Sequence, residues 1–172
     1  MKRGQIWISA VLYMALGVVA LTIILAAGVP MVQKMKDKNS VTQTKNVFLL
    51  LDQNIRGVVN EGPGARRYIS PLQLSAGEFY VTPDRLIWNM TTKAKLLEPG
   101  VVINEGAVEM RNYETFLEDE FVMNLQLNYV DIAVLQLSSE FSNPFVGVYS
   151  MSIEHTGEYQ DSKPIVKISM TG

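Results

Sequence analysis

An uncharged stretch from Ile6 to Val29 constrains this chain more than any other feature of its sequence. It spans 24 residues and contains no charged side chain. As an α-helix it would be about 36 Å long, enough to cross a hydrocarbon core of roughly 30 Å. A core helix of a soluble domain would carry polar residues along one side, and this segment does not. The sequence therefore predicts a helix that lies in a membrane at some stage.

The residues on either side of this stretch bear on whether it is removed. A conventional secretory signal has an apolar region of about 7–15 residues followed by a small-x-small cleavage site. The stretch here is longer, and the sequence AAGVPMVQ at its end is a weak match to such a site. Both observations disfavour cleavage after the apolar stretch, although a cleaved, secreted β protein of unknown activity stays open as an alternative.

The four residues before the stretch form the order K-R-G-Q, which resembles the class III signal peptide of archaeal type IV pilin-like proteins. The resemblance implies that a membrane-embedded prepilin peptidase cuts after Gly4 and makes Gln5 the new N-terminus. Lys2 and Arg3 would be the basic leader that stays in the cytoplasm. The intact apolar helix would then leave the membrane and form a filament core with other pilin-like subunits. A glycine suits the cleavage position because it readily adopts extended geometry.

The sequence departs from the fuller pattern of that family, Q-x-S-x-E-x-x-x-L. Trp7, Ser9 and Tyr13 stand where the serine, the glutamate and the leucine would be. In the family the glutamate pairs with the free amine of a neighbouring subunit, because a carboxylate in an apolar core is costly unless paired. Type II secretion pseudopilins that lack it tend to lie at the filament tip. Ser9 therefore suggests a minor or tip subunit.

A stripe of small residues follows one side of the predicted helix. Alternating spacings of three and four residues connect six positions, at Ala10, Tyr13, Gly17, Ala20, Ile24 and Ala27, and four of the six are small: Ala10, Gly17, Ala20 and Ala27. Small side chains let helix backbones approach closely in a membrane or a filament core. The alternative is that alanine and glycine are simply common in any membrane helix.

The net charge of −2 conceals a strong asymmetry along the chain. Residues 31–67 carry about four net positive charges and residues 68–172 about eight net negative ones. A basic stem before an acidic domain is unlike a nucleic-acid-binding protein, whose basic patch would lie on the folded domain. By count, the lysines on the far side of the apolar stretch favour a cytoplasmic domain: Lys34, Lys36, Lys38 and Lys45. The leader lies closer to the membrane edge, so we expect the domain outside the cell.

Beyond the apolar stretch the sequence predicts that the helix continues. Pro30 indicates a kink near Gly28–Pro30, and the polar residues Lys38–Ser40 indicate a weak point. Apolar residues return at helical spacing in this part of the chain: Met31, Met35, Val41, Phe48, Leu51, Ile55 and Val58. The glycines and proline of NEGPGARR should end the helix.

The rest of the chain reads as β structure. Alternation is clearest in FVMNLQLNYV and FVGVYSMSIE, and weaker in GEFYV, RLIWNM, GVVIN, AVEMR, DIAVLQL and PIVKISM. We expect an α+β protein in which a long N-terminal helix precedes a mainly antiparallel β head. The expected parts are a leader (1–4), a membrane or filament-core helix (5–30), an amphipathic stem helix (31–60) and the head (61–172).

The sequence carries little that suggests chemistry. It has no cysteine and one histidine, His155, which we interpret as a turn residue at the end of a strand. The acidic run Glu118–Glu120 lacks the spacing of a calcium loop and is expected to be solvated. No phosphate-binding loop or nucleophile elbow is present. We therefore expect no enzyme activity, no cofactor, no metal site and no small-molecule substrate.

One modification signal stands out. Asn89, Met90 and Thr91 form an N-x-T sequon, which should lie on the surface if the head is outside the cell. Such a triplet also arises by chance in many chains of this length. The neighbouring Trp88 should face the core, because strand residues alternate between faces.

Together these features predict a subunit, with a minor one favoured, of an archaeal type IV pilus-like filament or pseudopilus. It would serve adhesion, secretion or surface structure. The chain would be a single-pass membrane protein before assembly and part of a surface filament afterwards. The main alternative is an uncleaved single-pass protein whose β head is a binding module.

Overall fold

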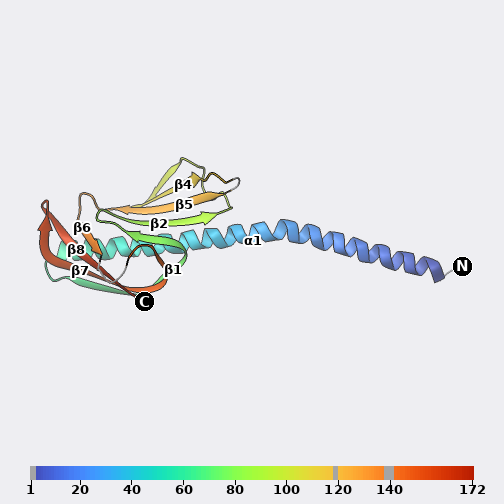
Figure 1. Cartoon of the computed structure of the whole chain (residues 1–172), viewed down its shortest axis with the longest axis horizontal. Helices are drawn as coiled ribbons and strands as arrows, with labels where there is room; N and C mark the ends of the chain where they lie inside the picture. The colour runs from blue at the N-terminus through green and yellow to red at the C-terminus, as the bar shows by residue number, and fades with distance from the viewer. Residues whose placement is uncertain (1–2, 118–119, 138–141) are drawn as a thin grey trace. The chain divides into compact units, whose positions relative to one another are not determined.

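A computed structural model describes residues 3–117, 120–137 and 142–172 of the chain (Figure 1). Contacts divide the chain into two compact units, one ending at Lys36 and the other beginning at Asp37. The helix α1 (Arg3–Glu61) contributes residues to both units. The predicted fold class is confirmed, since a long apolar N-terminal helix precedes a mostly antiparallel β sheet.

Helix α1 is a single element of 59 residues. It continues through Pro30 and through Lys38–Ser40, so neither segment ends the helix. Helix α1 ends where Gly62 adopts a positive φ of 88° and its amide donates to the carbonyl of Val58 at 3.3 Å. A glycine in the left-handed region just after the last turn is a common helix stop.

Eight strands form one sheet in the described part of the chain. Their order across the sheet is β3-β4-β5-β2-β1-β7-β8-β6, and all neighbours are antiparallel except β6 and β8, which are parallel. The strands are β1 (Arg66–Val81), β2 (Arg85–Thr92), β3 (Val102–Glu105), β4 (Val108–Glu114), β5 (Phe121–Asn128), β6 (Val134–Leu137), β7 (Phe145–Gln160) and β8 (Lys163–Thr171).

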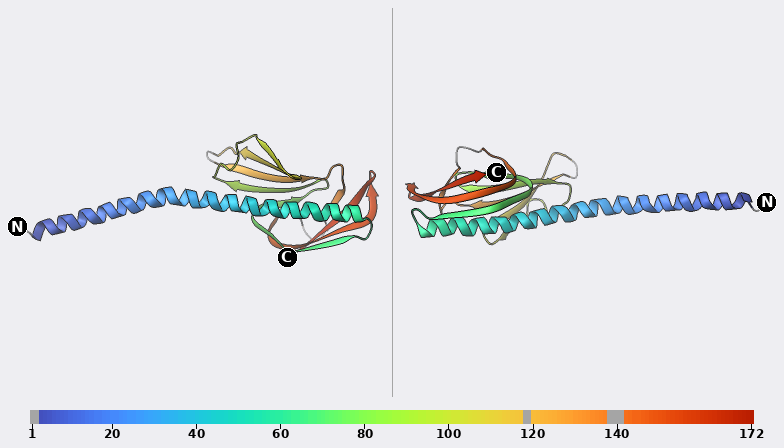
Figure 2. Two further views of the ribbon diagram at one scale, coloured as in Figure 1. Left: turned by 180° about the vertical axis from the view of Figure 1, so that it is seen from behind. Right: turned by 90° about the horizontal axis from the view of Figure 1, so that it is seen from below.

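The core of the second unit lies between the sheet and the last turns of α1, which run along one face of the sheet (Figure 2). Four α1 side chains at helical spacing are fully buried: Phe48, Leu51, Ile55 and Val58. Phe48 meets Phe79 of β1 edge to face, with ring centroids 5.8 Å apart. Burial of these side chains stabilises the helix that carries them, because helices in proteins depend mainly on packing.

Strands β1 and β7 are longer than the sequence predicts. The sequence predicts β1 only at Gly77–Val81, but the strand begins at Arg66. Its pairing with β7 shifts register between Ile69 and Leu72 and again between Leu74 and Phe79. Each shift changes which residues face the core, so the apolar alternation breaks within one strand.

His155 corrects a second expectation. It does not lie in a turn but within β7, where it is 1% exposed. Its Nδ1 accepts a hydrogen bond from the amide of Gly157 at 3.0 Å, and its ring meets that of Tyr159 edge to face. The register shift in β7 after His155 extends the strand beyond the residues that alternate.

Candidate functional site

The apolar half of α1 exposes its side chains on every side. Every described large apolar side chain from Trp7 to Met35 is 54–77% exposed. In the described residues α1 is the one helix long and apolar enough to cross a membrane, and none of its apolar window is buried. Apolar surface gains roughly 25 cal/mol for each Å² removed from water, so burial of this segment against lipid or protein would be favourable.

The predicted small-residue stripe lies within this exposed segment. Ala10, Gly17, Ala20 and Ala27 are all exposed. A Cβ atom added at Gly17 or at Gly28 would meet nothing within 4 Å. The fold of this chain therefore does not require small residues there. Gly28 was not part of the predicted stripe, yet it lines a shallow groove of about 360 Å³ on the helix surface.

The predicted cleavage site lies at the start of α1. Lys2 lies outside the described residues, and for Arg3, Gly4 and Gln5 the structure describes the helical backbone alone. The amides of the first four residues of a helix have no intrahelical acceptor. Opening the backbone around Gly4 for a protease therefore breaks few hydrogen bonds.

Basic side chains of the chain fall into two groups. In the second unit, Lys45 pairs with Glu105 at 2.6 Å and Arg56 with Asp52 at 2.8 Å. Arg66 and Arg67 pair with Glu154 and Glu61. Lys34, Lys36 and Lys38 make no ion pair with any residue that the structure describes, and the same holds for Lys93, Lys163 and Lys167. The lysines at positions 34, 36 and 38 can therefore meet an acidic partner or anionic lipid.

Asn89 lies in the middle of β2, on the solvent face of the sheet, where it is partly exposed. Its Oδ1 accepts a hydrogen bond from Asn124 Nδ2 of β5 at 2.7 Å. Trp88 is fully buried on the opposite face, as the sequence predicts. The use of the sequon stays a prediction.

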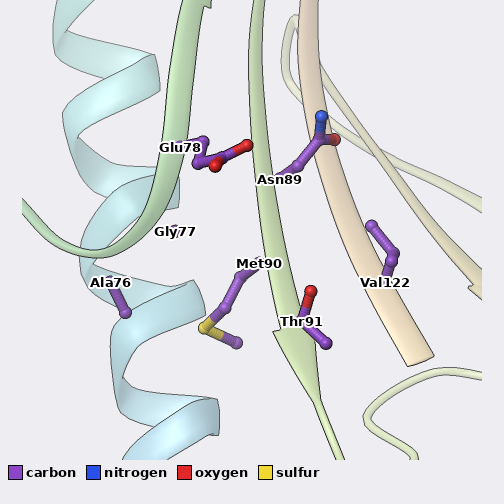
Figure 3. Close-up of a pocket in the computed structure, with 7 residues that line it drawn as sticks. All are labelled: Ala76, Gly77, Glu78, Asn89, Met90, Thr91 and Val122. Carbon is purple, nitrogen blue, oxygen red and sulfur yellow. The ribbon is translucent and has the colours of Figure 1, made fainter. Parts of the chain in front are cut away.

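A depression of about 550 Å³ adjoins Asn89 (Figure 3). Its lining comes from three strands: Ala76, Gly77 and Glu78 of β1, Asn89, Met90 and Thr91 of β2, and Val122 of β5. The depression forms where β1 shifts register around Gly77, and Trp88 Nε1 donates to the carbonyl of Ala76 at 2.6 Å there. Sequence reasoning missed this site because a strand bulge depends on pairing between distant segments.

A polar contact anchors α1 within the core of the second unit. Asp37 and Thr92 are buried, and Thr92 Oγ1 donates to Asp37 Oδ2 at 2.5 Å. Further along, Tyr129 donates to Asp52 Oδ1 at 3.2 Å. Burial, together with the nearby Asp52 carboxylate, raises the pKa of Tyr129. Both contacts join the helix to the sheet and serve the fold.

The metal-ligating side chains of the described residues do not cluster. No group of three or more histidine or acidic side chains that could hold a metal ion is found among them. Glu118 and Asp119 of the acidic run lie outside the described residues. The His155 ring contacts the Gly157 amide and the Tyr159 ring, and no acidic side chain of the described residues bonds to it.

Comparison with known proteins adds no further assignment. No protein-family model, no curated protein and no solved structure matches this chain.

Proposed function

We propose that this chain is a pilin-like subunit whose apolar helix first anchors it in the membrane and then packs in a filament core. The observation that supports this most is the composition of α1. Its first half exposes apolar side chains all round, and its second half buries one face in the head. A single helix would thus join the membrane or filament part to a folded head.

Assembly would use the side of α1 that carries small residues. Gly17 and the alanines at positions 10, 20 and 27 are exposed and unneeded for the fold of one chain. In a helix bundle such residues permit close backbone approach, which increases van der Waals contact between neighbours. The partners would be other copies of this chain or related subunits.

Maturation would remove the basic leader. We infer that a prepilin peptidase cuts between Gly4 and Gln5, with Lys2 and Arg3 on the cytoplasmic side. The lysines at positions 34, 36 and 38 would lie near the outer membrane surface, where each could contribute about 1 kcal/mol on an anionic membrane.

Ser9 favours a specialised role for this subunit. The glutamate expected at that position would tie each subunit to the amine of its neighbour, and serine carries no charge to do so. A subunit that lacks this carboxylate–amine ion pair suits a tip or minor position. The same residue supports the second candidate, an uncleaved single-pass anchor for a binding head.

Helix packing can be tested with two matched substitutions. Gly17→Leu places a bulky side chain on the small-residue stripe, whereas Val19→Leu adds one methylene about 200° away around the helix. We expect Gly17→Leu to reduce the amount of protein in sheared surface filaments and Val19→Leu to leave it unchanged. Membrane levels of both variants serve as the expression control.

Equal filament levels for the wild type and both variants would contradict packing through this stripe. A wild-type protein that never leaves the membrane fraction would favour the anchor instead.

A further inference from the structure

The solvent face of four neighbouring strands carries two adjoining rows of polar side chains. Strand register places Glu78, Asn89, Asn124 and Arg111 side by side across β1, β2, β5 and β4. In the next row Gln126 lies opposite Glu109. We name this surface the amide face: Glu78, Asn89, Asn124, Gln126, Glu109 and Arg111.

Hydrogen bonds between strands hold these side chains in place. Asn124 Nδ2 donates to Asn89 Oδ1, and Gln126 Nε2 donates to Glu109 Oε1, both at 2.7 Å. Arg111 Nε donates to the same Glu109 oxygen, so the guanidinium balances the negative charge of the Glu109 carboxylate. Asn89 Nδ2, Asn124 Oδ1 and Gln126 Oε1 have no hydrogen-bond partner among the described residues. The amide face therefore offers both donors and acceptors in fixed positions.

Strand propensity does not explain the two asparagines. Asparagine is depleted in strands, and exposed strand positions gain more from threonine or another β-branched residue. Asn89 and Asn124 nevertheless lie opposite each other in the middle of β2 and β5. Residues that break a local preference without a compensating gain in packing are expected at functional sites.

The depression described above lies beside Asn89 and Glu78 and makes this end of the amide face concave (Figure 3). It depends on Gly77, whose φ is +81° and whose added Cβ would lie 2.3 Å from the carbonyl oxygen of Asn89. A close backbone approach that only glycine permits shapes this hollow. Strand bulges often re-aim side chains beside binding sites.

We propose that the amide face binds a neutral saccharide carried by another molecule, such as a surface glycan. Hydroxyl groups of sugars both donate and accept, which matches the paired amides. Strands lie about 4.8 Å apart, comparable to the length of a sugar ring, so the row from Glu78 to Arg111 would span a short oligosaccharide. The rings of Tyr80 and Tyr113, on the same face, offer apolar surface for the C–H side of a sugar.

Other ligand classes fit less well. Residues 68–172 carry about eight net negative charges, which disfavours nucleic acid. An extended peptide would add to a free strand edge, whereas β2 and β5 are paired on both sides. A glycan attached to Asn89 itself would occupy the same face and is the competing occupant. Saccharide binding here would not depend on leader cleavage or filament assembly.

The test uses the full chain in a detergent without a sugar headgroup, with maltotriose, mannotriose and chitotriose as probes in isothermal titration calorimetry. We expect at least one probe to bind with Kd of about 1 mM or tighter. Asn124→Thr should weaken that binding about tenfold while leaving the melting temperature unchanged or higher, since threonine is the better strand residue. Gln126→Ala, a second variant, should also weaken binding. Gln136→Ala, which removes an exposed amide on β6, is the matched control and should bind as the wild type does.

Several results would overturn the proposal. One is that none of the three probes binds. Another is that Asn124→Thr and Gln126→Ala bind as tightly as Gln136→Ala. The third is a native protein whose Asn89 peptide carries a covalent glycan by mass spectrometry. None of these results bears on whether the leader is cut.

Discussion

Gly77 shows how one residue shapes the surface of the head. Its positive φ, and the carbonyl oxygen of Asn89 so close to where a Cβ would lie, exclude any side chain. Gly100 has a similar φ of +79°, but an added Cβ would meet nothing within 4 Å. An alanine at Gly100 would therefore meet backbone strain alone, whereas an alanine at Gly77 would meet backbone strain and a steric clash.

We predict that Gly77→Ala destabilises the head by about 3 kcal/mol or more, from strain and clash together. Gly100→Ala should cost about 1 kcal/mol, from strain alone. Urea unfolding followed by tryptophan fluorescence measures both, because Trp88 lies in the core. Equal losses for the two variants would mean that the approach of β1 to β2 is not tight.

Tyr129 links pH to the stability of the core. Burial, and then the Asp52 carboxylate that accepts its hydrogen bond, raise its pKa above the ordinary value of about 10. Above that pH the unfolded chain releases the phenolic proton and the folded chain retains it. Stability is therefore fully present below about pH 10 and falls as the pH rises.

We predict that Tyr129→Phe lowers the free energy of unfolding by about 1 kcal/mol at neutral pH, through loss of the hydrogen bond to Asp52. The difference from wild type should narrow as the pH rises above about 10, because phenylalanine cannot ionise. Urea unfolding over a pH series measures this, with the exposed Tyr159→Phe as control. Parallel pH curves for wild type and Tyr129→Phe would refute the linkage.

Single residues were only partly predictable from the sequence. Trp88 was correctly expected in the core, because strand residues alternate between faces and its neighbour Asn89 belongs to the solvent face. The environment of His155 was not, although His155 continues the buried alternation of Met151 and Ile153; the sequence analysis ended the strand too early, because β7 continues past a register shift after His155. The Asp37–Thr92 contact joins residues 55 positions apart, so no local rule could find it.

At the level of elements, the second half of α1 has a buried face and an exposed face, and two neighbouring leucines differ in which face they occupy. Leu51 is fully buried, whereas Leu50 is 46% exposed. Leu51→Ala should lower the free energy of unfolding of the head by about 3 kcal/mol and Leu50→Ala by less than about 1 kcal/mol. Urea unfolding of both variants measures this. Similar losses would show that α1 does not present Leu51 to the sheet.

The elements were predicted best where apolar residues keep one period. The helix and the alternating strands β2 and β5 follow this rule. The first part of β1 does not, because shifts at Ile69 to Leu72 and at Leu74 to Phe79 change the phase of its alternation. The depression beside Asn89 arises at the second shift. The shifts in register therefore explain why the sequence predicted neither the full length of β1 nor this depression.

For the whole molecule, the proposed function requires that the mature protein keeps the apolar helix and loses the basic leader. The exposed apolar side chains of α1 would gain free energy on burial, and both a membrane and a filament core would bury them. The mature N-terminus distinguishes the pilin-like subunit from the uncleaved anchor and from a secreted protein.

The most direct measurement is the intact mass of the native protein, with its N-terminal peptide identified by mass spectrometry. We predict an N-terminus at Gln5, with the helix from Ile6 onward retained. A chain that begins at Met1 would contradict leader cleavage. A chain that begins near Met31 would contradict retention of the helix.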